Sequence, residues 1–157
     1  MNRNDIREEK IDTLNELISV TRDSAKFYGE AATEAKNPQL QSLFRSLADS
    51  KNGIVGALAR EVRSEGAEPE AKGSFSGSLH RLYGEVRGKL ASDDYAYVSQ
   101  LEESEDRMLH AYRDVLKDDE TPQTVKTVVN EYLPKVQAQH DLMRDKKWAM
   151  QDNTRTH

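Results

Sequence analysis

Apolar side chains recur every three or four residues through most of this chain, and this repeat is the feature that most limits its fold. Four long segments carry it, at about residues 12–35, 39–64, 94–117 and 122–148. This spacing places the apolar side chains on one face of an α-helix. Because a one-sided helix must bury its stripe against other elements, the pattern predicts an all-α helical bundle.

Residues that end or begin helices separate these segments. Asn37-Pro38 ends the first helix and opens the second, because proline is well tolerated in a first helical turn. Gly66 is suited to end the second helix, and the run Ser92-Asp93-Asp94 is suited to cap the helix at residues 94–117. Pro134 lies inside the last segment, where it should kink the helix or interrupt its hydrogen bonds.

The order of the segments predicts an up-down four-helix bundle built from two helical hairpins. Residues 66–93 form the crossover between the hairpins, and a shorter apolar repeat predicts an extra helix at about residues 76–91. Residues 1–11 are polar and are expected to be frayed, and residues 151–157 are expected to form a loose tail. Residues 12–150 should therefore form one domain. Gly53 and Gly56 weaken the second helix unless they mark the close approach of a neighbouring helix.

The composition argues against several classes of function. The chain has no cysteine, so disulfides, thiolate metal sites and cysteine nucleophiles are absent. The formal net charge is −5, and Lys and Arg alternate with Asp and Glu. Without a basic stripe we expect no nucleic-acid partner. No apolar run approaches the length of a membrane span, and the polar N-terminus is not a secretory signal. We therefore expect no membrane contact and a cytoplasmic location.

Polar residues interrupt the apolar stripe near the middle of each long helix. They are Thr21, Lys51, Glu105 and His140, and they could lie at one level of the bundle. Because buried charges need a partner, we predict that Lys51 pairs with Glu105, with a further hydrogen bond from His140 or Gln137. Alternatively, Lys51 extends outward along the edge of its stripe.

The layout of hairpin, crossover and hairpin resembles the ferritin and rubrerythrin group of four-helix bundles. In that group the first helix of each hairpin has a Glu seven residues before a Tyr, and the second has an aromatic residue, an Ala and then Glu-x-x-His. Here Glu105 precedes Tyr112 by seven residues. The other matching positions are Thr21 before Tyr28, Phe44 and Ala48 before Lys51 and Ile54, and Gln137-x-x-His140.

Shorter motifs are similar to a bacterial branch of this group whose function is unassigned. Some relatives in that branch are associated with stress responses. The motifs are Leu14-Asn-Glu-Leu-Ile18, Gly77-Ser-Leu-His-Arg81, Glu105-Asp106 and His140-Asp141.

The resemblance implies a di-iron centre, but most of its ligands are missing here. Of the six implied ligand positions only Glu105 and His140 keep a ligand type, and one carboxylate cannot balance two divalent ions. Lys51 could instead supply the positive charge of a metal. We therefore favour a degenerate site with no cofactor and no catalytic residue. The alternative is a partial site for iron or another divalent metal at Glu105 and His140.

Three functions are compatible with these patterns. The favoured one is a non-catalytic bundle that acts through self-association, for example as a dimer, or through an unidentified protein partner. The second is a metal-dependent oxidase, peroxidase or iron-storage protein. The third is a bundle with a small polar pocket around Lys51 that binds a ligand.

Overall fold

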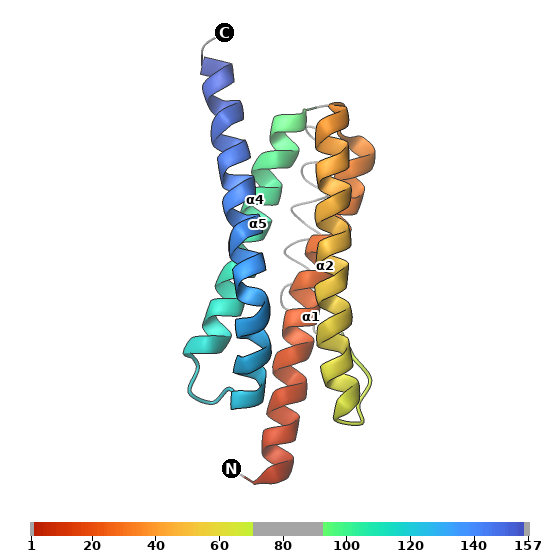
Figure 1. The fold of residues 1–157 in the computed structure, drawn as a ribbon, viewed down its shortest axis with the longest axis vertical. Coiled ribbons are helices and arrows are strands. Elements are labelled where there is room, and N and C mark those ends of the chain that lie inside the picture. Colours follow the sequence, from red (N-terminus) through yellow and green to blue (C-terminus); the bar gives the residue numbers. More distant parts are fainter. Residues whose placement is uncertain (1, 71–92, 156–157) are drawn as a thin grey trace.

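Four long helices make up nearly all of the described chain. The computed structural model describes residues 2–70 and 93–155, with side chains as far as residue 152. The helices are α1 (Arg3–Glu34), α2 (Pro38–Ser64), α4 (Asp94–Lys117) and α5 (Gln123–Arg155). They lie side by side along one axis (Figure 1). The predicted all-α four-helix bundle is confirmed, whereas the short helix expected at about residues 76–91 lies outside the described residues.

The direction of each helix follows from contacts at the two ends of the bundle. At one end, the Asp94 carboxylate accepts hydrogen bonds from the backbone N–H groups of Lys36, at 2.8 Å, and Asn37, at 2.9 Å. This places the start of α4 beside the turn between α1 and α2. At the opposite end, the Arg7 side chain donates two hydrogen bonds to the backbone carbonyl of Glu65, just after α2. Helices α2 and α4 therefore run parallel, as a single crossover between two hairpins requires.

The helix boundaries inside the bundle agree with the sequence signals. The Asn37 side chain accepts hydrogen bonds from two backbone N–H groups in the first turn of α2, and Pro38 occupies that turn. Asp93 caps α4 through the backbone N–H of Tyr95. Gly66 has a φ of +79°, a left-handed conformation that only glycine adopts readily.

The first helix begins nine residues earlier than predicted, so the expected fraying of residues 1–11 is wrong for residues 3–11. The Asn2 side chain accepts a hydrogen bond from the backbone N–H of Asp5 and caps α1. Lys10 Nζ lies 2.8 Å from the Glu65 carboxylate, and this contact lowers the pKa of that carboxyl group. Contacts across the bundle therefore order a segment whose own composition favours solvent.

The last helix is also longer than predicted, because α5 continues to Arg155 and does not end near residue 148. The loose tail expected from residue 151 is wrong for residues 151–155. The Gln151 side chain donates a 2.8 Å hydrogen bond to the Tyr95 hydroxyl and holds this part of α5 beside α4. Pro134 lies within α5 without ending it.

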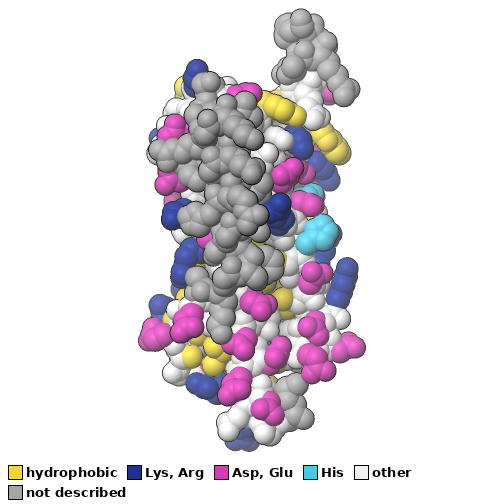
Figure 2. Space-filling model, turned by 180° about the vertical axis from the view of Figure 1, so that it is seen from behind, with side chains coloured by type: hydrophobic (Ala, Val, Ile, Leu, Met, Phe, Trp, Pro, Cys, Tyr) yellow, Lys and Arg dark blue, Asp and Glu magenta, His cyan; other side chains and the backbone are white. Residues whose placement is uncertain are grey.

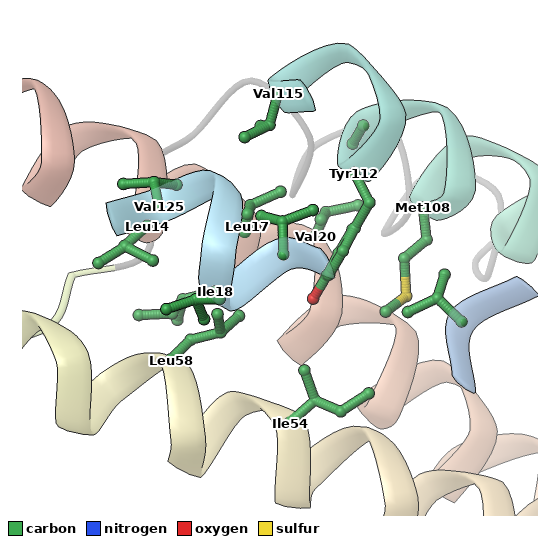
Figure 3. Close-up of a cluster of buried hydrophobic side chains, with 14 of the residues drawn as sticks. Leu14, Leu17, Ile18, Val20, Ile54, Leu58, Met108, Tyr112, Val115 and Val125 are labelled. Carbon is green, nitrogen blue, oxygen red and sulfur yellow. The ribbon is translucent and has the colours of Figure 1, made fainter. Parts of the chain in front are cut away.

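The buried apolar side chains form two separate clusters along the bundle. The first cluster draws on all four helices near the end at which α1 begins, and Figure 3 shows it around Leu17, Leu58 and Tyr112. The second lies near the turn between α1 and α2 and includes Phe44 and Leu101. Along each helix, the stretch between the two clusters contains the polar residue that interrupts the apolar stripe.

Candidate functional site

A layer of polar side chains lies between the two apolar clusters and receives at least one residue from every described helix. We use the name polar layer for Tyr28 of α1, Ser50 and Lys51 of α2, Glu105 of α4 and Gln139 of α5. Their hydrogen bonds form one chain that crosses the bundle. This layer is the part of the interior with the chemistry of a functional site.

The ion pair expected between Lys51 and Glu105 is present at the centre of the layer. Lys51 Nζ lies 2.8 Å from each oxygen of the Glu105 carboxylate. Both side chains are 0% exposed. Burial lowers the pKa of Lys51, and the negative charge and hydrogen bond of Glu105 oppose that shift. The alternative in which Lys51 extends outward is therefore wrong.

Tyr28 supplies the second hydrogen bond to Glu105. Its hydroxyl donates to Glu105 Oε1 over 2.6 Å, and the residue is fully buried. Burial raises the pKa of the Tyr28 phenol well above its usual value, and the Glu105 charge raises it further. Tyr28 therefore stays a neutral donor, which suits it to stabilise a carboxylate.

Gln139 completes the layer from α5, although no sequence pattern singled it out. Its side-chain oxygen accepts a hydrogen bond from Lys51 Nζ over 2.7 Å, and its Nε2 donates to Ser50 Oγ over 2.7 Å. The amide therefore has one partner for its acceptor and one for its donor. These bonds link α5 to α2 at mid-height.

Thr21 lies beside the layer but makes a separate pair. Its hydroxyl is hydrogen-bonded to the Tyr112 hydroxyl over 2.7 Å and donates to the backbone carbonyl of Leu17 at the same distance. Figure 3 shows the Tyr112 ring between Leu17 and Met108. Burial raises the pKa of Tyr112 as well. Thr21 is therefore a satisfied core hydroxyl and does not contact Lys51 or Glu105.

Gln137 and His140 do not join Lys51 and Glu105, so this part of the predicted cluster is wrong. The Gln137 side chain is hydrogen-bonded to Arg113 and to Asp141. His140, whose side chain is 12% exposed, lies 3.3 Å from Asp106 of α4 and 3.0 Å from Asp141. These residues form a polar contact between α4 and α5 at the edge of the bundle.

The spacing of the apolar stripe explains why Gln139 was missed. Val136 and Met143 are both fully buried in α5. Positions 139 and 140 each lie within one helical turn of both residues, so either fits a stripe with three- and four-residue steps. Only the rotation of α5 against α4 decides which of the two side chains faces inward.

The polar layer does not fit the di-iron centre that the resemblance implies. The one carboxylate, Glu105, is already neutralised by Lys51, and Ile54 belongs to the first apolar cluster. Thr21 and His140 have partners elsewhere. Among the described residues, no three or more His, Cys, Asp or Glu side chains are grouped to hold a metal ion. Because iron in such bundles needs several carboxylates, these donors match neither its charge nor its coordination.

Comparison with known sequences gives the family. The sequence pattern of a domain of unknown function, DUF2383, matches residues 9–118, which include most of α1 and all of α2 and α4. The chain belongs to the DUF2383 family. No curated protein sequence matches this DUF2383 chain. The family match therefore establishes a relationship but indicates no biochemical activity.

Comparison with solved structures shows the fold. A mutant of Dps1 from Mycobacterium smegmatis has a similar structure, with a TM-score of 0.69 over 94% of the DUF2383 chain and 99% of the Dps1 chain. The two sequences are 11% identical. Dps1 has a ferritin-like fold, so the DUF2383 chain is a ferritin-like bundle of unassigned function.

Removing one partner of the central ion pair should destabilise the protein strongly. Lys51→Met or Glu105→Gln leaves an unpaired buried charge or an unmatched donor, and we expect each to lower the free energy of unfolding by about 3–5 kcal/mol. Lys51→Met with Glu105→Gln should recover most of that loss. Urea unfolding of the four proteins measures this coupling. Additive losses in the double variant would show that the two residues do not interact.

Alkaline pH should unfold the protein partly through its two buried tyrosines. Tyr28 and Tyr112 keep their protons in the folded state above their usual pKa of 10.0, whereas the unfolded chain releases them. The unfolded state then binds fewer protons, so stability falls as pH rises above about 10, by up to about 1.4 kcal/mol per pH unit for each tyrosine. The lowered pKa of Lys51 has the opposite sign and acts below its usual value of 10.5.

Comparison of the unaltered protein with Tyr28→Phe and Tyr112→Phe isolates this effect. Each variant should lose stability less steeply between pH 10 and pH 11.5 in urea titrations. An identical slope in all three proteins would contradict the assignment.

Proposed function

We propose that this DUF2383 chain is a non-catalytic helical bundle that acts through protein contacts, self-association included. The observation that supports this most directly is the buried ion pair at the centre of the polar layer. Lys51 and Glu105 use their charges on each other and are fully buried. A small molecule or metal would have to break this pair before it could bind there. Chemistry at the centre is therefore disfavoured, and the outer surface is left to carry the function.

A groove between α1 and α2 is the surface we propose for such contacts. It has a volume of about 480 Å³, and Ala25, Gly29 and Ala48 are among the residues that line it. The remaining lining residues are polar or charged: Arg22, Lys26, Glu30, Arg45, Asp49 and Asn52. Because the small residues at the base of the groove lie between charged residues at its sides, the groove has room for a side chain or a helix from another molecule.

The glycines on these two helices support an outside partner. A Cβ atom added to Gly29 or Gly53 would meet no atom within 4 Å in the described structure. Gly53 therefore does not mark the close approach of any of the four described helices. Each glycine costs a helix about 1 kcal/mol relative to alanine. A neighbouring molecule at this face would explain that cost.

Four charged side chains on the walls of the groove, three basic and one acidic, are available for intermolecular contacts. Within the described residues, Arg22, Lys26 and Arg45 form no ion pair. Asp49, on the same groove, also forms none there. A surface that carries free charges of both signs can pair with a second copy of itself or with a polar partner.

A cluster of acidic side chains on another part of the surface supports the expectation that nucleic acid is not a partner. A second cleft, of about 390 Å³, lies between α1 and α4 and is lined by five carboxylate residues. They are Glu9, Asp12, Glu16, Asp114 and Asp118. Figure 2 shows acidic side chains over much of the lower part of the face that it presents. Such a surface repels phosphate groups.

No helix in the described part of the chain has the length and apolar character that a membrane span requires. A cytoplasmic location and a role in a bacterial stress response remain part of the proposal. They rest on the sequence features and the resemblance given above.

Self-association through the groove can be tested with bulky side chains at Gly29, which lines it, and at Gly53, which follows the lining residue Asn52 in α2. Because a Cβ has open space at both positions, Gly29→Gln and Gly53→Gln should fold normally and block a neighbour. We expect the unaltered protein to show a concentration-dependent increase in mass by light scattering. Both variants should remain monomers, whereas Ala138→Gln on the exposed surface of α5 should behave like the unaltered protein. A strict monomer at every concentration would contradict self-association.

The alternative function, a partial iron site at Glu105 and His140, predicts a different result. In the structure these residues have separate partners, so an iron site would require both to move. We expect protein purified without chelators to contain no stoichiometric iron, manganese or zinc by elemental analysis. We also expect Fe(II) oxidation in air at the rate of buffer alone. One or two tightly bound metal ions per chain would favour the metal-dependent alternative.

A further inference from the structure

We propose that the centre of the bundle is a binding site for a primary ammonium group, which the chain fills with its own Lys51. This assigns a ligand class to Glu105, Gln139 and Tyr28. It stands apart from the proposed contact function, because a site of this kind can exist whether or not the chain binds other proteins.

The number of acceptors matches an ammonium group. A primary ammonium has three N–H donors and no acceptor. Lys51 Nζ donates hydrogen bonds to Glu105 Oε2 at 2.8 Å and to Gln139 Oε1 at 2.7 Å, and Glu105 Oε1 lies 2.8 Å away within the ion pair. Three oxygen atoms therefore surround the ammonium group, as many as it has N–H groups.

The acceptors are held in place by residues other than Lys51. Tyr28 donates to Glu105 Oε1, and Ser50 accepts from the Gln139 amide, which directs the amide oxygen towards the ammonium group. The site is thus organised from three sides by α1, α4 and α5, independently of the lysine side chain. Preorganised acceptors of this kind favour binding because little order remains to be imposed.

The charge and surroundings of the site also select a monovalent organic cation. Glu105 contributes one negative charge, and Gln139 and Tyr28 are neutral. Lys51 and Glu105 are both 0% exposed between the two apolar clusters, whereas Gln139 is half-buried. One buried negative charge balances one ammonium, whereas a pair of divalent metal ions would leave positive charge uncompensated. The missing metal ligands and the buried lysine therefore have a common explanation.

The test replaces the tethered ammonium by a free one. Lys51→Ala keeps Cβ and removes three carbons and the nitrogen, which is the composition of n-propylammonium. We expect this ligand to raise the Tm of the full-length variant in thermal unfolding. At ten times its dissociation constant, a ligand that binds only the folded state raises the folding constant about elevenfold, or the Tm by about 3–6 °C.

Matched controls separate charge from volume. 1-Propanol has a similar length without the charge and should stabilise Lys51→Ala much less. Lys51→Met fills the same space and should not respond to n-propylammonium, nor should Lys51→Ala with Glu105→Gln, which lacks the carboxylate. Equal stabilisation by propanol would overturn the ammonium site in favour of a simple apolar cavity. Stronger stabilisation by Co²⁺ would overturn it in favour of a metal site, and no response to n-propylammonium would also overturn it.

A measurement on the unaltered protein decides the question if Lys51→Ala does not fold. In ¹H–¹⁵N spectra at pH 7, one lysine Nζ should appear as a charged ammonium whose protons exchange slowly with water, and Lys51→Met should remove that signal. A neutral amine at Lys51, or an Nζ that exchanges as fast as the surface lysines, would contradict the proposal.

Discussion

A charge buried in the middle of a helical bundle must be neutralised there, and this requirement organises the interior of the protein. Lys51 and Glu105 satisfy it for each other at 2.8 Å, and Tyr28 and Gln139 satisfy the remaining hydrogen bonds. A shift by one residue along any of these helices would move a side chain by 1.5 Å and rotate it by 100°. The pair would then be broken, so the polar layer favours one register among the four described helices.

The stability of the fold comes mainly from the two apolar clusters on either side of that layer. Removal of a charged pair from water costs several kcal/mol per ion, and the attraction between the ions roughly offsets this cost. A buried pair is therefore weak evidence for added stability. Its effect here is better described as specificity, because each alternative packing would leave a buried ammonium or carboxylate alone. The Thr21–Tyr112 pair adds a similar but uncharged constraint between α1 and α4.

The buried Lys51–Glu105 pair also distinguishes this chain from the di-iron bundles that its fold resembles. The chain shares the ferritin-like fold with Dps1 at 11% sequence identity. A likeness at this level shows a common fold and says nothing about the chemistry of the DUF2383 chain. In the DUF2383 chain the charges at the centre of the bundle are paired with each other. Several features of the surface have no partner within the described residues. They are the glycines Gly29 and Gly53 and the charges of Arg22, Lys26, Arg45 and Asp49 beside the α1–α2 groove. The proposed role in protein contacts follows from this difference between the paired central charges and the unpaired surface charges.

The sequence by itself determined the four long helices and the breaks at Asn37-Pro38 and Gly66, because apolar periodicity and turn residues act locally. It suggested the pairing of Lys51 with Glu105 but left open an outward-extending lysine, and the structure decided between the two. The tertiary structure alone decided that residues 3–11 are helical, because Lys10 and Arg7 reach Glu65 and its carbonyl more than fifty residues away. It also decided that Gln139, and not His140, faces Lys51. That choice depends on how α5 is rotated against its neighbours, and a three- and four-residue repeat fits both rotations equally well.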